Sequence, residues 1–387
     1  MKTTKLTLTL LAIVATTDIA FAEPAGVTAD SVRIGSITDL SGPAAPGMIP
    51  VQAGARMRFE EVNAAGGVHG RKIDLRAEDG QYQVPLSVRA ANKLVNDGIF
   101  AMLLTGGTPP NLAAMPILDK ENVPNLFPIT AAISMVEPFH KNHFSLFVSY
   151  QDQTAGALRY FHKKDGVTKA CVQTVANEYG QEVIAGAKKE AAALGVTLSL
   201  IGEHKITETN FAGTASAIKN SGCEVLLLGT TFKDTISLYA ALRQLGWNKP
   251  VVGNMLSFHP LVAEANNGVT EGLYLVTPYI AANFADGNEF RANFLKRYQA
   301  QYKEYPNTYV QIGYTAADLV IKALDRAGRD LTTKGFTDAL ESLDRYDDPF
   351  GGPSYSFSKE KHFGGTSLVL IQASDRTWKS VAKDLSY

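Results

Sequence analysis

The sequence is poor in the features that mark redox, nucleic-acid-binding and hydrolytic proteins. Its only two cysteines, Cys171 and Cys223, form no Cys-x-x-Cys pair, so thiol redox catalysis is not indicated. The 37 Lys and Arg nearly balance the 38 Asp and Glu, and without a basic excess the chain is not expected to bind nucleic acid. Residues 229–233 lack the Gly-Lys-Ser/Thr ending of a phosphate loop, and no Gly-x-Ser-x-Gly elbow occurs. We therefore expect no enzymatic activity, no cofactor and no nucleic-acid partner.

Long apolar runs are also scarce, and the one that stands out is at the N-terminus. Lys2 and Lys5 precede an apolar run of about ten residues, and Ala20-Phe21-Ala22 follows it. This order predicts a secretory signal peptide, residues 1–22, that is cleaved after its last alanine. A membrane anchor is the alternative, but a span needs about 20 apolar residues, and Asp18 interrupts this run. We expect a soluble protein of the periplasm.

After residue 30, strand-like and helical patterns alternate along the chain. The strand-like runs lie at 99–104, 125–129, 170–175, 225–229, 251–253 and 272–276. The helical stretches lie at 86–97, 179–194, 211–220, 235–245 and 289–304. This alternation is typical of α/β proteins whose parallel sheets are covered by helices on both faces. The length suits two domains of ordinary size.

The segment from Val32 to Asp79 is the most informative part of the chain. Its periodicity predicts a strand at 32–37, a helix over 51–62 and a second strand at 72–75, which together form a βαβ unit. Three motifs accompany the unit: Leu40-Ser41-Gly42-Pro43, then Asn-Ala-Ala-Gly-Gly-Val-His-Gly-Arg at 63–71, then Glu78-Asp79. In this order and spacing, the unit resembles the opening of the branched-chain amino acid-type (Leu/Ile/Val-binding-like) periplasmic solute-binding proteins of ABC transporters.

The resemblance covers nearly all of residues 31–380 and implies the type I periplasmic binding fold. Two doubly wound, Rossmann-like α/β lobes would be joined by a three-segment hinge. We place the crossings near 149–150, 277–278 and 352–353. The N-terminal lobe would then comprise 31–148 plus 279–352, and the C-terminal lobe 149–278 plus 353–387.

The resemblance also implies a function. A monomer would capture a small-molecule ligand, a small organic solute, between its lobes. It would then deliver the solute to the membrane permease and ATPase subunits of an ABC importer. The alternative is a ligand-sensing receptor module of the same fold that acts through a separate signalling partner. Such a module would normally continue into a membrane span or signalling domain, whereas this chain stops at Tyr387.

The two cysteines leave a structural question open. Cys171 and Cys223 each stand at the start of a predicted strand, and the two strands would be neighbours in a doubly wound sheet. In an oxidising compartment the two sulfurs could then form a disulfide. The alternative is two small buried residues that are close but unbonded.

Candidate binding residues follow from the rule that ligands bind beyond the carboxyl ends of the strands, where helix N-termini expose free N–H groups. The loops after the predicted strands are rich in hydroxyls and glycine and poor in charge, which suits a small carboxylate or amide. In the first lobe the candidates are Ser41, Tyr82, Thr108, Pro109, Thr130 and Ala131. In the second lobe they are Tyr150, Tyr179, Thr230, Thr231, Asn254 and Met255.

Three of these positions match family features. Thr108 precedes Pro109 as an N-cap precedes an N1 proline, so its hydroxyl would face the cleft; it could instead only cap its helix. Thr130 and Ala131 match the family's second ligand-contacting loop. Tyr179 matches the Tyr-Gly that opens the second lobe's first helix, where the family's tyrosine covers the ligand; packing on its own helix is the alternative.

Other candidates are less tied to the family pattern. Thr230 and Thr231 stand at the family's variable pocket position, where a larger aromatic residue is frequent. Tyr82 and Tyr150 could line the cleft or pack at the hinge. His140-x-x-His143 could in principle bind a metal ion, but the sequence shows no third ligand, so we expect none.

One departure from the family pattern bears on the ligand. Members that bind amino acids place an acidic residue after the strand that corresponds to 251–253, and this chain has Asn254-Met255 there. A buried ammonium without an anionic partner is costly. The sequence therefore favours a neutral or simple carboxylate ligand, aliphatic or aromatic. Glu178 could replace the missing acid, which leaves a branched-chain amino acid possible.

Overall fold

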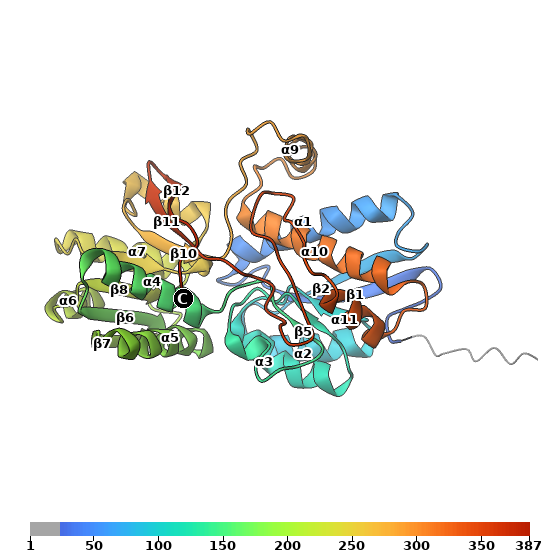
Figure 1. Ribbon diagram of the computed structural model, residues 1–387, viewed down its shortest axis with the longest axis horizontal. Helices are drawn as coiled ribbons and strands as arrows, with labels where there is room; N and C mark the ends of the chain where they lie inside the picture. The colour runs from blue at the N-terminus through green and yellow to red at the C-terminus, as the bar shows by residue number, and fades with distance from the viewer. Residues whose placement is uncertain (1–23) are drawn as a thin grey trace, which may run out of the picture.

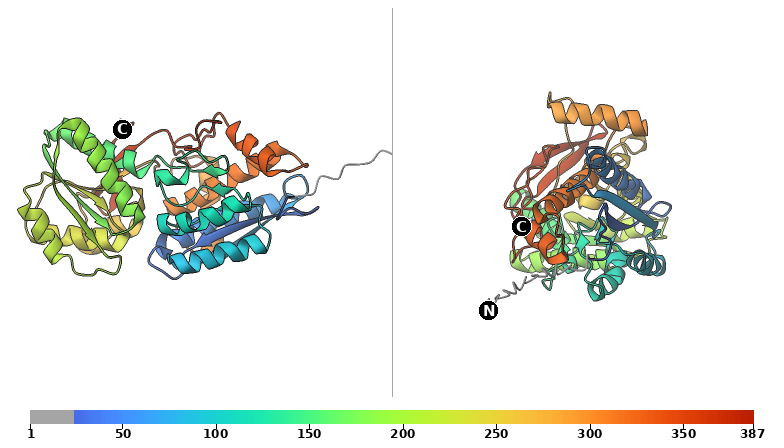
Figure 2. Two further views of the ribbon diagram at one scale, coloured as in Figure 1. Left: turned by 90° about the horizontal axis from the view of Figure 1, so that it is seen from below. Right: turned by 90° about the vertical axis from the view of Figure 1, so that its right-hand side faces the viewer.

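The computed structural model describes residues 24–387, so the predicted signal peptide lies outside the described residues. Among residues 24–387, no helix is at once long enough and apolar enough to span a bilayer. Two α/β lobes lie side by side along the long axis of the molecule, and segments of chain pass between them (Figures 1 and 2).

The first lobe is built on a parallel sheet with the strand order β2-β1-β3-β4-β5. Its strands are β1 (Ser31–Thr38), β2 (Lys72–Asp79), β3 (Ala101–Leu103), β4 (Asn125–Leu126) and β5 (His143–Phe144). Successive side chains point to opposite faces, so both faces must be covered by helices. Ile34 belongs to the core beneath α1 (Ala45–Ala64), α10 (Thr308–Ala327) and α11 (Thr333–Glu341). Ile37 belongs to the core beneath α2 (Val84–Asn96) and α3 (Thr108–Lys120).

The second lobe contains a larger sheet with the order β12-β11-β10-β9-β8-β6-β7. Its strands are β6 (Lys169–Val175), β7 (Thr197–His204), β8 (Val225–Gly229), β9 (Val251–Gly253), β10 (Tyr274–Thr277), β11 (Val369–Ser374) and β12 (Thr377–Ala382). Strands β6 to β10 pair in parallel, and β11 and β12 add an antiparallel edge. The predicted α/β class with two doubly wound lobes is confirmed.

Helices cover both faces of this sheet as well. One face is covered by α4 (Tyr150–Asp165) and α5 (Glu178–Leu194), and the other by α6 (Ala212–Asn220) and α7 (Phe232–Gln244). The remaining helical segments are η1 (Ile133–Met135), η2 (Met255–Ser257), α8 (Pro260–Ala263), η3 (Asn266–Gly268) and α9 (Glu289–Tyr302). Helix α9 stands out from the body of the first lobe (Figure 1).

The chain returns to the first lobe after it has built most of the second. Helix α10 packs on α1 so closely that the two backbones touch. A Cβ atom placed on Gly54 would lie 2.0 Å from the carbonyl oxygen of Val310, and one on Gly313 would lie 1.9 Å from that of Val51. Any side chain at either glycine would push the two helices apart.

The last return to the second lobe comes late in the chain. Phe363 bridges Ser145 beside β5, and the N–H of Gly364 donates to the carbonyl of Ser145 at 2.7 Å. Strand β11 then joins the second sheet. We therefore propose that the third crossing lies between residues 365 and 368 and not near 352–353 as predicted, because Phe363 and Gly364 still pair with the first lobe. The first two crossings stay predictions, near 149–150 and 277–278.

A disulfide joins Cys171 in β6 to Cys223, which precedes β8, with the two Cα atoms 5.7 Å apart. The question left open by the sequence is thus answered in favour of pairing. Because β6 and β8 are neighbouring parallel strands, their early residues lie at the same edge of the sheet. The bond therefore lies at the opposite edge from the carboxyl ends of the strands.

Candidate functional site

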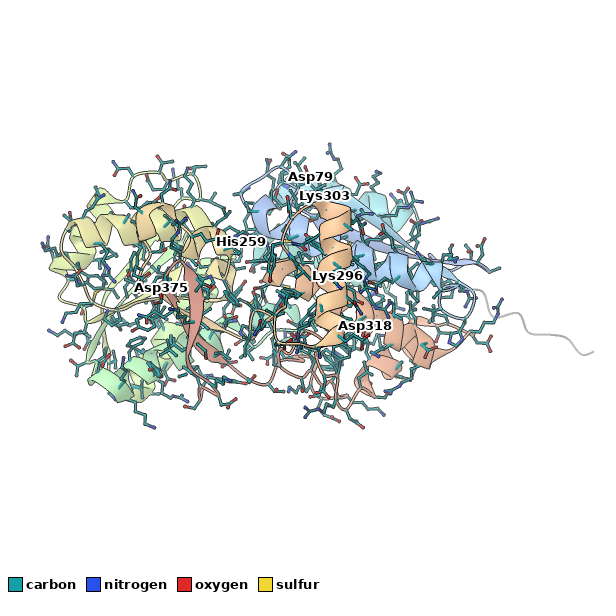
Figure 3. All side chains as sticks on the ribbon, turned by 90° about the horizontal axis from the view of Figure 1, so that it is seen from above. Asp79, His259, Lys296, Lys303, Asp318 and Asp375 are labelled. Carbon is teal, nitrogen blue, oxygen red and sulfur yellow. A yellow bond between two sulfur atoms is a disulfide. The ribbon has the colours of Figure 1, made fainter. Side chains whose placement is uncertain are left out.

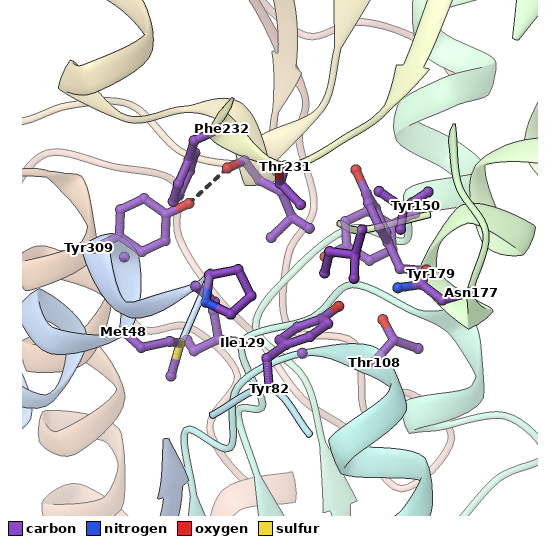
Figure 4. A pocket seen from close by; sticks show the side chains of 17 residues that line it. Met48, Tyr82, Thr108, Ile129, Tyr150, Asn177, Tyr179, Thr231, Phe232 and Tyr309 are labelled. Atoms are coloured by element: carbon purple, nitrogen blue, oxygen red, sulfur yellow. Dashed lines mark hydrogen bonds between the residues drawn. The ribbon is translucent and has the colours of Figure 1, made fainter. Parts of the chain in front are cut away.

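A pocket lies between the lobes, where the carboxyl ends of the two sheets face each other (Figure 4). The strand order reverses between β1 and β3 in one sheet and between β6 and β8 in the other, and such switch points form ligand-binding crevices. The space that protein atoms leave free in the pocket, including the part open to solvent, is about 650 Å³. The pocket is narrow, so it fits a small ligand.

Every α-helix that lines the pocket does so with its first turn. These first-turn residues are Met48 of α1, Thr108 of α3, Tyr150 of α4, Tyr179 of α5, Phe232 of α7 and Tyr309 of α10. The first N–H groups of a helix have no partner within it, and the helix dipole places about half a positive charge there. Some of these N–H groups are already paired, because the side chains of the N-cap residues of α4, α5, α7 and α10 accept hydrogen bonds from them. Six helix N-termini thus face the pocket, and no cationic side chain lines it.

No charged side chain of the described residues lines the pocket. Asp39 is buried and accepts hydrogen bonds from the N–H groups of Ser41 at 3.2 Å and Ala44 at 2.8 Å, so its carboxylate already neutralises the start of α1. Glu178, the possible substitute acid, is exposed to solvent and lies outside the lining. The pocket therefore offers no carboxylate to pair with an ammonium group.

Hydroxyl groups supply the polar part of the lining near α3. The Oγ1 atoms of Thr108 and Thr130 lie 2.7 Å apart, in a hydrogen bond that either can donate. The buried hydroxyl of Tyr150 is close to Thr130 but makes no hydrogen bond of normal geometry with the described residues. Pro109 and Pro110 have no N–H, so α3 presents few amide donors and these hydroxyls take their place.

The tyrosines form the aromatic wall of the pocket. The rings of Tyr150 and Tyr179 meet edge to face, with centroids 4.8 Å apart, and the hydroxyl of Tyr179 lies 3.1 Å from Oδ1 of Asn254. Tyr82 reaches across the cleft to Asn177. Burial raises the pKa of Tyr82, Tyr150 and Tyr179, so their hydroxyls stay protonated and can donate at physiological pH.

Polar contacts between the lobes close the pocket. The hydroxyl of Tyr309 donates to the carbonyl of Leu256 at 3.1 Å (Figure 4, dashed line). His259 lies at the junction of the lobes (Figure 3), and its Nε2 is 3.2 Å from the carbonyl oxygen of Pro46. Burial lowers the pKa of His259 to about 4, so at neutral pH its uncharged ring donates this hydrogen bond. The structure is therefore that of a closed cleft.

The pocket brings together five of the twelve predicted binding residues. They are Tyr82, Thr108, Tyr150, Tyr179 and Thr231. Two more, Thr130 and Asn254, lie directly behind the lining and hydrogen-bond to Thr108 and Tyr179.

The other five lie outside the pocket lining. Pro109 belongs to the first turn of α3, and Ala131 is buried, with its carbonyl accepting from the N–H of Tyr150. Ser41 is exposed and donates to Oδ2 of Asp79 at 2.7 Å. The hydroxyl of Thr230 is 2.6 Å from that of Thr235, and the N–H of Met255 donates to Oε1 of Gln153 at 3.1 Å. Their side chains or amides are engaged within the protein.

Two local predictions are wrong. Thr108 is the first residue of α3 and not its N-cap, which is Gly107 at φ 85° and ψ 153°. Only glycine adopts this conformation readily, and a Cβ atom there would lie 2.3 Å from Cε2 of Tyr82. Tyr179 opens the second helix of its lobe and not the first, because α4 precedes α5.

Several lining residues were not among the predicted ones. Phe232 directly follows Thr231, a predicted residue that also lines the pocket, and Leu256 directly follows Met255, which does not. Both loops were therefore predicted, but these two residues of them were not. Tyr309 was not predicted because it does not follow a predicted strand. It belongs to α10, and local periodicity does not show that this helix begins at the pocket.

The sequence model of the family described as periplasmic binding protein matches residues 31–377. The leucine-, isoleucine-, valine-, threonine- and alanine-binding protein of Pseudomonas aeruginosa is 22% identical over 305 residues, which are 78% of this chain and 80% of that protein.

Solved structures show the same fold. The fatty acid ABC transporter substrate-binding protein from Thermomonospora curvata superposes with a TM-score of 0.84 at 20% identity, covering 94% of both chains. A branched-chain amino acid ABC transporter protein from Thermus thermophilus with bound valine gives a TM-score of 0.83 at 18% identity, covering 92% of this chain and 97% of that one.

Proposed function

The chain belongs to the periplasmic binding protein family, and we propose that it captures a small organic monocarboxylate between its lobes and delivers it to the permease and ATPase of an ABC importer. We further propose that it acts as a monomer after removal of residues 1–22. The printed names of its relatives include amino-acid-binding and fatty-acid-binding proteins, so the family does not fix the ligand. No feature of residues 24–387 favours the alternative of a sensory module.

The observation that carries this proposal is a pocket that six helix N-termini face and that no charged side chain lines. A carboxylate gains about 0.3–1 kcal/mol from each well-placed helix N-terminus. A buried ammonium without an anionic partner loses several kcal/mol on leaving water. The same pocket thus attracts a carboxylate and rejects the ammonium of an α-amino acid.

The apolar wall indicates what the carboxylate is attached to. Five aromatic side chains line the pocket, namely Tyr82, Tyr150, Tyr179, Phe232 and Tyr309. Rings of this kind pack edge to face or offset against another ring and also accept branched alkyl groups. We therefore propose an aromatic or branched aliphatic acid as the solute.

The protein can capture a solute by closing its lobes, because the pocket lies between them. A solute that contacts both lobes binds the closed state better than the open one, so it shifts the balance towards closure. The hydrogen bonds of Tyr309 with Leu256 and of His259 with Pro46 join the two lobes, so opening the cleft would break them. The closed form is then the one presented to the permease.

The ligand class can be tested with pairs that differ only in the amino group. We expect 4-methylpentanoate to bind at least 100-fold more tightly than leucine, and 3-phenylpropanoate more tightly than phenylalanine, because the ammonium finds no partner. Isothermal titration calorimetry on untagged protein measures both pairs. Micromolar binding of leucine together with weak binding of 4-methylpentanoate would reverse the assignment.

A second expectation concerns the hydroxyl of Tyr150. Tyr150→Phe should weaken carboxylate binding about tenfold or more, since a hydrogen bond to a charged group contributes about 1.5–3 kcal/mol. The free energy of unfolding should stay equal or rise, because this hydroxyl has no partner of normal geometry among the described residues. Calorimetry and urea unfolding measure the two quantities, with Tyr305→Phe at an exposed tyrosine as the control. Unchanged affinity would remove the Tyr150 hydroxyl from the site.

A further inference from the structure

We propose that Asp119, His140 and His143 form a binding site for one divalent transition-metal ion of the zinc class. The sequence offered His140 and His143 without a third ligand, and the fold supplies Asp119 from the end of α3. One ligand atom from each of the three residues lies within 4.8 Å of the others. Nε2 of His143 and Oδ1 of Asp119 are 2.7 Å apart.

The three ligands are anchored in the lobe yet open to solvent on one side. His143 begins β5 and its side chain is fully buried, whereas the side chain of Asp119 is 38% exposed. His140 belongs to the turn before β5 and is partly exposed. An ion can therefore reach the cluster from solvent, which a real metal site requires.

The backbone already holds the two histidines side by side. The N–H of His143 donates to the carbonyl of His140 at 3.2 Å, and the two rings stack with centroids 4.6 Å apart. Nδ1 of His362 lies 3.1 Å from the carbonyl oxygen of His140 and 2.8 Å from that of His143, and its ring stacks on Phe144 at 3.9 Å. The turn that presents the ligands is thus fixed from a distant part of the chain, as an organised metal site requires.

The donor set selects the kind of ion. Two imidazoles and one carboxylate, with water in the fourth position, suit tetrahedral Zn²⁺, whose bonds of about 2.0–2.1 Å place its ligand atoms about 3.3 Å apart. Mg²⁺ and Ca²⁺ prefer oxygen ligands and do not fit. The ring of His140 has no hydrogen-bond partner among the described residues, so a modest rotation can bring it to the ion.

The ion would clamp α3 to β5 without touching the pocket. Asp119 is eleven residues from Thr108 in the same helix, which corresponds to about 16 Å at 1.5 Å per residue. We therefore expect metal binding to raise the thermal stability of the protein and to leave its solute affinity unchanged. The inference is thus independent of the proposed ligand.

The test uses the untagged protein, freed of metal by dialysis against a chelator, and Zn²⁺ itself as the probe. Calorimetry and equilibrium dialysis are expected to give one Zn²⁺ per chain and no binding of Mg²⁺. His140→Ala and Asp119→Asn should each weaken Zn²⁺ binding at least tenfold, since each removes a direct ligand. Both change solvent-accessible side chains, and a circular dichroism melt without metal checks that each variant folds.

A matched control exists in the same lobe. His69 pairs with Asp325 at 3.4 Å, a histidine–carboxylate pair without a second histidine. His69→Ala should keep the Zn²⁺ affinity and the Zn²⁺-induced rise in melting temperature. Absence of Zn²⁺ binding to the wild-type protein would overturn the proposal, and so would full binding by His140→Ala.

Discussion

Replacing Tyr179 with alanine is expected to weaken solute binding about 30-fold or more, an effect typical of a buried aromatic residue at the centre of a binding site. Tyr179 is only 2% exposed and stands in the first turn of α5. Its ring supports that of Tyr150, and its hydroxyl hydrogen-bonds with Asn254. The substitution therefore removes a wall of the pocket and also frees the neighbouring ring to move. Calorimetry with the best acid from the ligand screen measures the loss.

Two variants separate the site effect from a loss of folding. Tyr179→Phe keeps the ring and removes only the hydroxyl, so it should retain most of the affinity. Tyr305→Ala makes the same truncation at a side chain that is 62% exposed and should change neither affinity nor stability. Unchanged affinity in a folded Tyr179→Ala protein would show that this residue does not contact the solute.

Removing the disulfide is expected to cost about 4 kcal/mol of unfolding free energy. The bond closes a loop between residues separated by 52 positions, and in the chain-entropy model a loop of this size confers that stability by restricting the unfolded chain. The double variant Cys171→Ala plus Cys223→Ala, compared with the wild type in urea unfolding, measures the loss. Each cysteine is almost fully buried, so alanine leaves only a small cavity.

The position of the disulfide predicts that function survives its removal. The bond lies near the amino ends of β6 and β8, and the pocket lies beyond their carboxyl ends. The solute affinity of the double variant should therefore equal that of the wild type at a temperature where both are folded. Wild-type protein treated with a reductant should show the same loss of stability as the variant. A loss below about 1 kcal/mol would contradict the loop-closure account.

Much of the fold could be predicted from the sequence, because its signals are local. The βαβ opening and the runs at 225–229 and 251–253 combine periodicity with clear breaks, and the structure contains strands there with the same bounds in the last two cases. Strand β5 has only two residues and gives no periodic signal. Helix α10 has an exposed polar face at Lys322 and Asp325, so its periodicity indicates a helix, but no local signal shows that this helix packs on α1 of the first lobe.

The site was harder to predict than the fold, because membership of a loop does not fix the direction of a side chain. Thr230 and Thr231 are neighbours after β8, yet Thr231 lines the pocket and Thr230 is hydrogen-bonded to Thr235. Ser41 matches the family motif, yet its hydroxyl is bonded to Asp79. The rule that ligands bind beyond the carboxyl ends of strands predicted the correct loops. Which residue of each loop faces the pocket depends on packing, which the sequence does not show.

The contact between α1 and α10 has a consequence for the order of assembly during synthesis. Strands β6 to β10 and helices α4 to α7 form one continuous stretch, so most of the second lobe can fold as a local unit. The first sheet is made earlier, but one of its faces is only partly covered, by α1, until α10 and α11 have been synthesised. Such a long-range requirement slows folding. The nascent chain therefore completes its earliest lobe late, which favours passage across a membrane before the tertiary structure forms.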